Sequence, residues 1–159
     1  MSKTKILAVL LVAALMLSAC FGSPSVNQGA LTAEEFTQRA EAAGYVAEDI
    51  SGAFSPLGPL DLQIRFFVNA PMFDAEFYAF QTDVTAQMLY ERLKYGLGLD
   101  IGGSVQYYSE TNEENFNIFR QTADGRFDML VRVENTLITI SADAENREYA
   151  EAFLRVLGY

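Results

Sequence analysis

The 159-residue chain contains no histidine, no tryptophan and a single cysteine, and its 11 basic residues face 21 acidic ones. Histidine is the commonest general base, the usual partner of a serine or cysteine nucleophile, and the commonest zinc ligand. Its absence excludes a conventional hydrolase triad and a histidine zinc site. A single cysteine cannot form a disulfide within the chain. The formal net charge of −10 argues against nucleic acid as a partner, because phosphate binding requires clustered lysine and arginine.

The single cysteine, Cys20, follows a short apolar run near the start of the chain. Lys3 and Lys5 precede this run, which extends over residues 6–17. A helix needs about 20 apolar residues to cross the bilayer core, so the run is too short to span it. A basic start, a short apolar stretch and small residues after it are the organisation of a secretory signal peptide.

The sequence Leu17-Ser18-Ala19-Cys20 resembles the lipobox of bacterial lipoproteins, in which leucine and two small residues precede a cysteine. The resemblance covers residues 1–20. It implies that signal peptidase II recognises Leu17, Ser18 and Ala19 and cleaves before Cys20, which carries a thioether-linked diacylglycerol. Two or more acyl chains, such as palmitate, anchor a protein stably where one does not. The expected location is the extracytoplasmic side of a bacterial membrane, either the cell membrane or the outer membrane.

The rest of the chain is predicted to form a tether and one domain. Loss of residues 1–19 removes two lysines and no acidic residue, which leaves a net charge of −12. Residues 20–30 contain two glycines, two serines, a proline, an asparagine and a glutamine, a composition typical of a flexible tether. Residues 31–159 are sufficient for a single domain with its own core.

Hydrophobic periodicity predicts three helices and six strands in this domain. Thr32 begins the first helix with a capping box, and Asp83 and Asp143 are predicted to cap the other two. Residues 62–68 alternate apolar and polar side chains, as a half-buried strand does. The order α-β-β-α-β-β-β-β-α favours an α+β fold, a mostly antiparallel sheet with about three helices packed on one face.

One face of the predicted sheet combines aromatic side chains with arginine, the composition of recognition surfaces. If the helices cover the face that carries Phe66 and Val68, the opposite face carries the candidate binding residues. These are Phe67, Tyr78, Phe80, Tyr108, Phe119 and Arg132. The same residues would also suit packing against a second layer or a homodimer seam, and the sequence leaves these alternatives open.

The sequence predicts no cofactor, no metal ligands and no catalytic residue. It indicates a membrane-anchored lipoprotein with a non-catalytic binding or envelope-accessory role. The expected partners are membrane lipid, through Cys20, and an envelope protein, peptide or glycan. The alternative is a carboxylate-dependent hydrolase of the cell envelope, because 21 acidic residues allow many carboxylate pairs in space.

The lipobox resemblance predicts the effect of replacing Cys20. The wild-type chain expressed in a bacterial host is expected to have the mass of residues 20–159 plus lipid, and Cys20→Ala to carry no lipid because the acceptor thiol is gone. Intact-protein mass spectrometry measures both. Ser18→Gly, which keeps a small residue before the cleavage site, is the matched control and is expected to be processed. A wild-type chain without lipid would contradict the resemblance.

Overall fold

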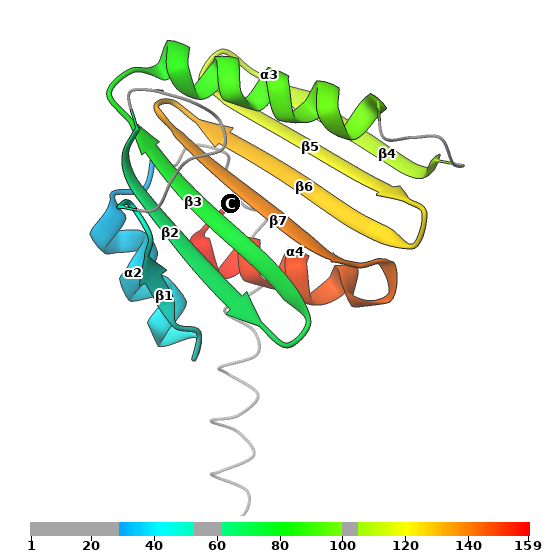
Figure 1. The fold of residues 1–159 in the computed structure, drawn as a ribbon, viewed down its shortest axis with the longest axis horizontal. Coiled ribbons are helices and arrows are strands. Elements are labelled where there is room, and N and C mark those ends of the chain that lie inside the picture. The colour runs from blue at the N-terminus through cyan, green and yellow to red at the C-terminus, as the bar shows by residue number, and fades with distance from the viewer. Residues whose placement is uncertain (1–28, 53–61, 100–104) are drawn as a thin grey trace, which may run out of the picture.

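The structure is a computed structural model that describes residues 29–52, 62–99 and 105–159. The predicted signal peptide, the lipobox residues 17–20 and the tether up to residue 28 lie outside the described residues. Within the described ranges, seven strands form one antiparallel sheet, with three α-helices packed against it (Figure 1). The predicted α+β class is therefore confirmed.

The observed elements follow the predicted order, with one additional short strand, β1, before the first long strand. Their bounds are α2 Ala33–Ala42, β1 Ala47–Asp49, β2 Leu62–Ala70, β3 Phe73–Phe80, α3 Asp83–Leu99, β4 Val105–Asn112, β5 Phe116–Ala123, β6 Arg126–Val133, β7 Thr136–Asp143, the 3₁₀ helix η1 Ala144–Asn146 and α4 Arg147–Leu157.

The strands lie in the order β1-β2-β3-β7-β6-β5-β4, and every neighbouring pair is antiparallel. Strands β2 and β3 form a hairpin, and α3 then leads the chain to the far edge of the sheet, where β4 begins (Figure 1). Strands β4 to β7 return as a meander, so that β7 pairs with β3 at the centre. Among the described strands, β4 therefore has a neighbour on one side only.

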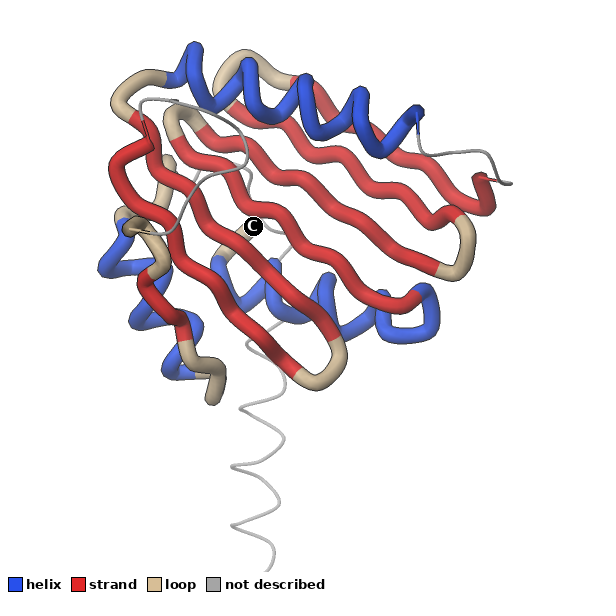
Figure 2. The backbone as a smooth tube through the Cα atoms, in the orientation of Figure 1, coloured by secondary structure: helices blue, strands red, loops and turns tan. Residues whose placement is uncertain are grey.

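The helices lie on both faces of the sheet, and the prediction that they share one face is wrong for α3. We call the face covered by α2 and α4 the first face, and the face covered by α3 the second face. Figure 2 shows α3 across one side of the strands and α4 behind the other. The central strands carry large apolar side chains on both faces of the sheet. Those on the second face, including Phe80, Leu130 and Leu137, pack with α3. They require a cover of their own because exposing them to water is unfavourable.

Aromatic side chains dominate the core of the first face. The rings of Phe36 in α2 and Phe77 in β3 stack with centroids 4.6 Å apart. The ring centroid of Phe153 in α4 lies 4.9 Å from that of Phe73 and 5.2 Å from that of Tyr45. Burial of such rings contributes strongly to stability, because each removes a large apolar area from water. These contacts hold α2 and α4 together against β3.

The helix starts match the capping predictions at one of three positions. The capping box at Thr32 is confirmed, with the Glu35 carboxylate accepting from the Thr32 backbone N–H at 2.8 Å. In α3 the hydroxyl of Thr82 accepts a bond from the backbone N–H of Thr85, as a capping residue does, and the carboxylate of Asp83 accepts one from the adjacent N–H of Val84. Asp143 makes no capping bond and precedes η1, because a 3₁₀ turn intervenes before α4. Both exceptions lie within a few residues of the predicted positions.

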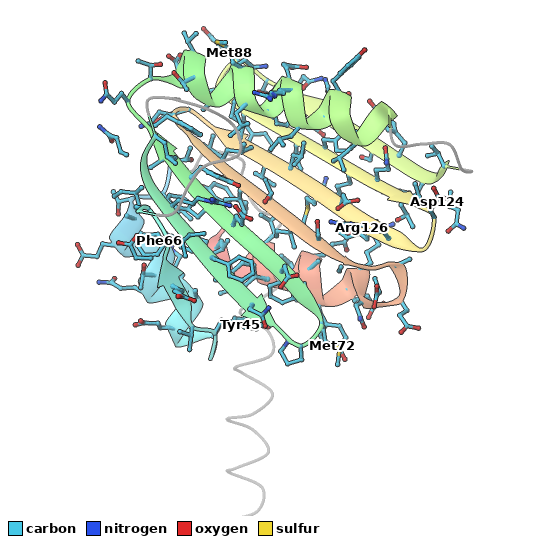
Figure 3. The ribbon with its side chains drawn as sticks, in the orientation of Figure 1. Tyr45, Phe66, Met72, Met88, Asp124 and Arg126 are labelled. Carbon is cyan, nitrogen blue, oxygen red and sulfur yellow. The ribbon has the colours of Figure 1, made fainter. Side chains whose placement is uncertain are left out.

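Neighbouring residues of α3 provide a test of its packing on the second face. Leu89 is 1% exposed, whereas Met88 is 63% exposed and lies on the outer side of the helix (Figure 3). Leu89→Ala is expected to lower the free energy of unfolding by about 2 to 5 kcal/mol, since it leaves a cavity. Met88→Ala should change it by less than about 0.5 kcal/mol. Denaturant unfolding measures both, and equal effects would contradict the packing of α3.

Candidate functional site

The six residues predicted to form a binding surface do share one face of the sheet, but α3 covers most of them. The strand register places Tyr78 and Arg132 on either side of Leu137 on the second face. Tyr78, Phe80, Phe119 and Arg132 are all buried there. These four residues therefore do not form an open aromatic surface.

The two other predicted residues remain more accessible. Tyr108 lies on the edge strand β4 and is 56% exposed. Phe67 lies on β2, opposite Glu76 of β3, and is half-buried. The two belong to strands near opposite edges of the sheet, because β4 is last in the strand order and β2 is second. The structure therefore does not bring them together into one site.

Arg132 is held by bonds that join two turns of the sheet. Its Nε donates to Asn117 Oδ1 at 2.5 Å, and its two terminal nitrogens donate to the backbone carbonyl oxygens of Glu114 and Glu134 at 3.1 Å. Burial lowers the pKa of the Arg132 guanidinium. Because these bonds link the β4–β5 turn to the β6–β7 turn, Arg132 has a structural role, although it borders a groove of about 590 Å³ beside α3.

Two further cations of the second face are bonded to carboxylates. Arg65 forms an ion pair with Glu76 at 2.7 Å, and Tyr78 also donates to that carboxylate. Arg126, the first residue of β6 (Figure 3), pairs with Asp128 at 3.0 Å. In both cases the positive charge is already compensated within the domain.

A polar cluster fastens the C-terminal half of α3 to the edge strand. Lys94 of α3 lies 2.8 Å from Glu110 of β4, which also accepts bonds from Tyr108 and Asn112. These bonds lower the pKa of Glu110 to about 2, and the bond from Lys94 has the largest effect, ahead of the bond from Tyr108. Glu110 is therefore charged at neutral pH and is saturated with donors.

A groove of about 390 Å³ opens on the first face, between α4 and the edge strands. Ile118 and Arg120 of β5 form its floor, Leu154 and Arg155 of α4 form one wall, and Tyr107 of β4 lies on the other side. We call it the α4 groove. It exists because α4 packs over the central strands β6 and β7 and does not extend over β4 (Figure 1).

The floor of the α4 groove contains an arginine without a bonded partner. Within the described residues, Arg120 makes neither a hydrogen bond nor an ion pair, although its side chain is about half-buried. Burial lowers the pKa of the guanidinium, and Arg147 acts in the same direction while Glu151 opposes them. Glu151 is itself paired with Arg147 at 2.8 Å. Arg120 therefore has positive charge and donor capacity available to a ligand.

The aromatic side of the groove is fixed by a second arginine. The guanidinium of Arg147 lies 4.0 Å from the centroid of the Tyr107 ring, within the range of a cation–π contact. This contact holds the ring between α4 and β4. The α4 groove thus offers a fixed aromatic ring, an apolar floor at Ile118 and a guanidinium with free donors.

Sequence reasoning did not single out Arg120 or Tyr107. The sequence did contain an indication of Arg120. It follows Phe116 and Ile118 at a spacing of two, so its side chain lies on the same, inward-facing side of β5. A charged residue in an inward phase is unusual unless it is paired. The sequence alone could not reveal that no acidic residue would pair with it.

Two other features of the described residues carry no site. The described residues contain no group of three or more acidic or cysteine side chains that could hold a metal ion. The hydroxyl of Tyr90 is buried without a hydrogen-bond partner among the described residues. Tyr90 lines neither the α4 groove nor the groove beside α3.

Comparison with known proteins yields no family. No protein-family model matches the chain, and no curated protein matches it. Among solved structures, a GTP binding regulator from Thermotoga maritima is similar over 80% of this chain and 88% of its own, with 14% sequence identity and a TM-score of 0.49. A likeness at this level carries no inference about function.

Proposed function

We propose that this chain is a lipid-anchored extracytoplasmic lipoprotein that binds an anionic ligand in the α4 groove without changing it chemically. The anchor rests on the lipobox at residues 17–20. The binding role rests on one observation: in an open groove, the half-buried Arg120 forms no hydrogen bond or ion pair with any residue that the structure describes. A buried charge is costly unless a counter-charge compensates it, so an anionic ligand would gain from filling this place.

The charge of the domain adds selectivity to this groove. The net charge after the predicted cleavage is −12, so the surface repels anions at long range. The α4 groove is an exception, since Arg120 and Arg155 both line it and form no ion pair within the described residues. Glu151 also lines the groove, but it is paired with Arg147. The preferred ligand is therefore one with a localised negative charge on an otherwise neutral or basic body.

The position of the domain fits a role close to a bilayer. In the ranges that the structure describes, no helix has the length and apolarity needed to cross a membrane. The proposed anchor is instead the lipid on Cys20, followed by a tether of roughly 10 residues. Random-coil scaling places the domain within about 20 Å of the bilayer. A ligand in the α4 groove would thus be held near the membrane surface.

The alternative function, a carboxylate-dependent hydrolase, has less support. A carboxyl group that acts as general acid near neutral pH requires a raised pKa. Hydrogen bonds from neighbouring groups lower the pKa values of Glu35, Asp49 and Glu110. These groups favour the charged form and are unsuited to donate a proton.

Titration with small anions tests the binding role. Acetate and inorganic phosphate, added to isotope-labelled full chain in detergent micelles, are expected to shift the NMR signal of the Arg120 side-chain N–H saturably. Arg120→Gln should abolish saturable binding, because it removes the charge while keeping a polar side chain.

Arg126→Gln is the matched control, because Arg126 is exposed and already paired with Asp128. It should leave the response at Arg120 unchanged. An Arg120 signal that does not respond to either anion, or saturable binding that survives in Arg120→Gln, would contradict the binding role.

A further inference from the structure

We propose that the ligand of the α4 groove is an extended peptide segment that adds to the free edge of β4 and places a carboxylate side chain on Arg120. This inference rests on the proposed anion-binding role of the groove and names the class of ligand. It follows from the position of the groove beside an edge strand, from the register of β4 and β5, and from the side chains that β4 directs to the first face.

Strand β4 has an unused pairing edge. It comprises eight residues, Val105–Asn112, and it is the last strand in the sheet order. Among the described strands it pairs with β5 alone, so its outer backbone N–H and C=O groups face away from the sheet. Edge strands are commonly protected by proline or lysine, and β4 contains neither. An extended peptide can satisfy these groups as an added strand.

The register places a small residue between Arg120 and this edge. Ser109 of β4 is the direct partner of Arg120, and both point to the first face. By the usual strand spacing of about 4.8 Å, a residue on an added strand opposite Ser109 would lie about 10 Å from β5. Extended arginine and glutamate side chains together cover that distance. A serine leaves the path between them open, which a bulky side chain would block.

The neighbouring positions predict the residues around that carboxylate. Tyr107 and Thr111 flank Ser109 at a spacing of two, so they share its face. Ile118, the partner of Thr111, belongs to the apolar floor. Side chains of an added strand alternate between faces, so the residues two places before and after the carboxylate would meet these groups. The preferred segment is apolar, any residue, acidic, any residue, apolar.

A second copy of this chain does not fit this requirement. If two copies joined through their β4 edges, each would offer the other Tyr107, Ser109 and Thr111 on the first face, and none of these is acidic. The only carboxylate on β4, Glu110, points to the second face and is bonded to Lys94. The β4 edge of a second copy therefore does not supply the carboxylate for Arg120, and we assign it to a peptide segment of a different protein.

Three synthetic peptides test the proposal on the full chain in detergent micelles. The first has the sequence acetyl-Val-Thr-Glu-Thr-Val-amide, the second has Gln in place of Glu, and the third is the first with N-methyl groups on the amides that would pair with β4. Binding is followed through the NMR signals of the β4 backbone and of Arg120. We expect the Glu peptide to bind at least tenfold more tightly than the Gln peptide and the N-methylated peptide to lose binding.

Two variants assign the contacts. Arg120→Gln should reduce the preference for Glu over Gln to near onefold. Ser109→Ile, which is compatible with a strand, should do the same by blocking the path, so the test remains available if one variant fails to fold. Tyr108→Phe, on the second face of β4, is the control and should keep the preference.

The outcomes separate this proposal from the function on which it rests. Acetate or phosphate binding at Arg120 without binding of any peptide would overturn strand addition and retain the anion site. Equal binding of the Glu and Gln peptides, or undiminished binding of the N-methylated peptide, would also overturn the proposal. Absence of binding by all anions and all peptides would overturn both.

Discussion

The burial of the central strands on both faces is the constraint on which the rest of this structure depends. Strands β6 and β7 carry large apolar side chains in both phases, so neither face can be left to water. Helix α3 covers one face and α2 with α4 cover the other. Because α3 leads from β3 to β4 over the second face, β4 becomes an edge strand and the first face beside it remains open. The α4 groove is a consequence of this topology.

The sequence was sufficient for the order of the elements and insufficient for their placement. Alternation along a strand reveals which residues share a face, and the six candidate residues do share one. It does not reveal which face a helix will cover, and for this reason Tyr78 and Phe119 were expected at a surface and are buried. Arg132 was expected to meet a ligand, yet it bonds turn oxygens that only the folded chain brings together. Cys20 lies outside the described residues, and its lipidation stays a prediction.

The distribution of positive charge distinguishes Arg120 from the other cations. Nine lysines and arginines follow residue 19. Within the part of the chain that the structure describes, six of them form a hydrogen bond or an ion pair and Arg92 also has a partner. Arg120 and Arg155 form neither kind of bond, although the charge of Glu151 acts on Arg120. Arg155 is exposed to solvent, which compensates its charge, whereas Arg120 is half-buried. Partly buried polar groups without a bonded partner are expected at functional sites, where a protein gives up some stability in order to bind a ligand.

The central claim is that Arg120 serves a ligand and not the fold, and the free energy of unfolding of Arg120→Met tests it most directly. Methionine has a similar length and no charge, so removal of a half-buried, unpaired guanidinium should raise the free energy of unfolding by about 0.5 to 2 kcal/mol. Arg132→Met, which breaks three hydrogen bonds, should lower it in the same assay. A loss of stability in Arg120→Met as large as that in Arg132→Met would contradict the account.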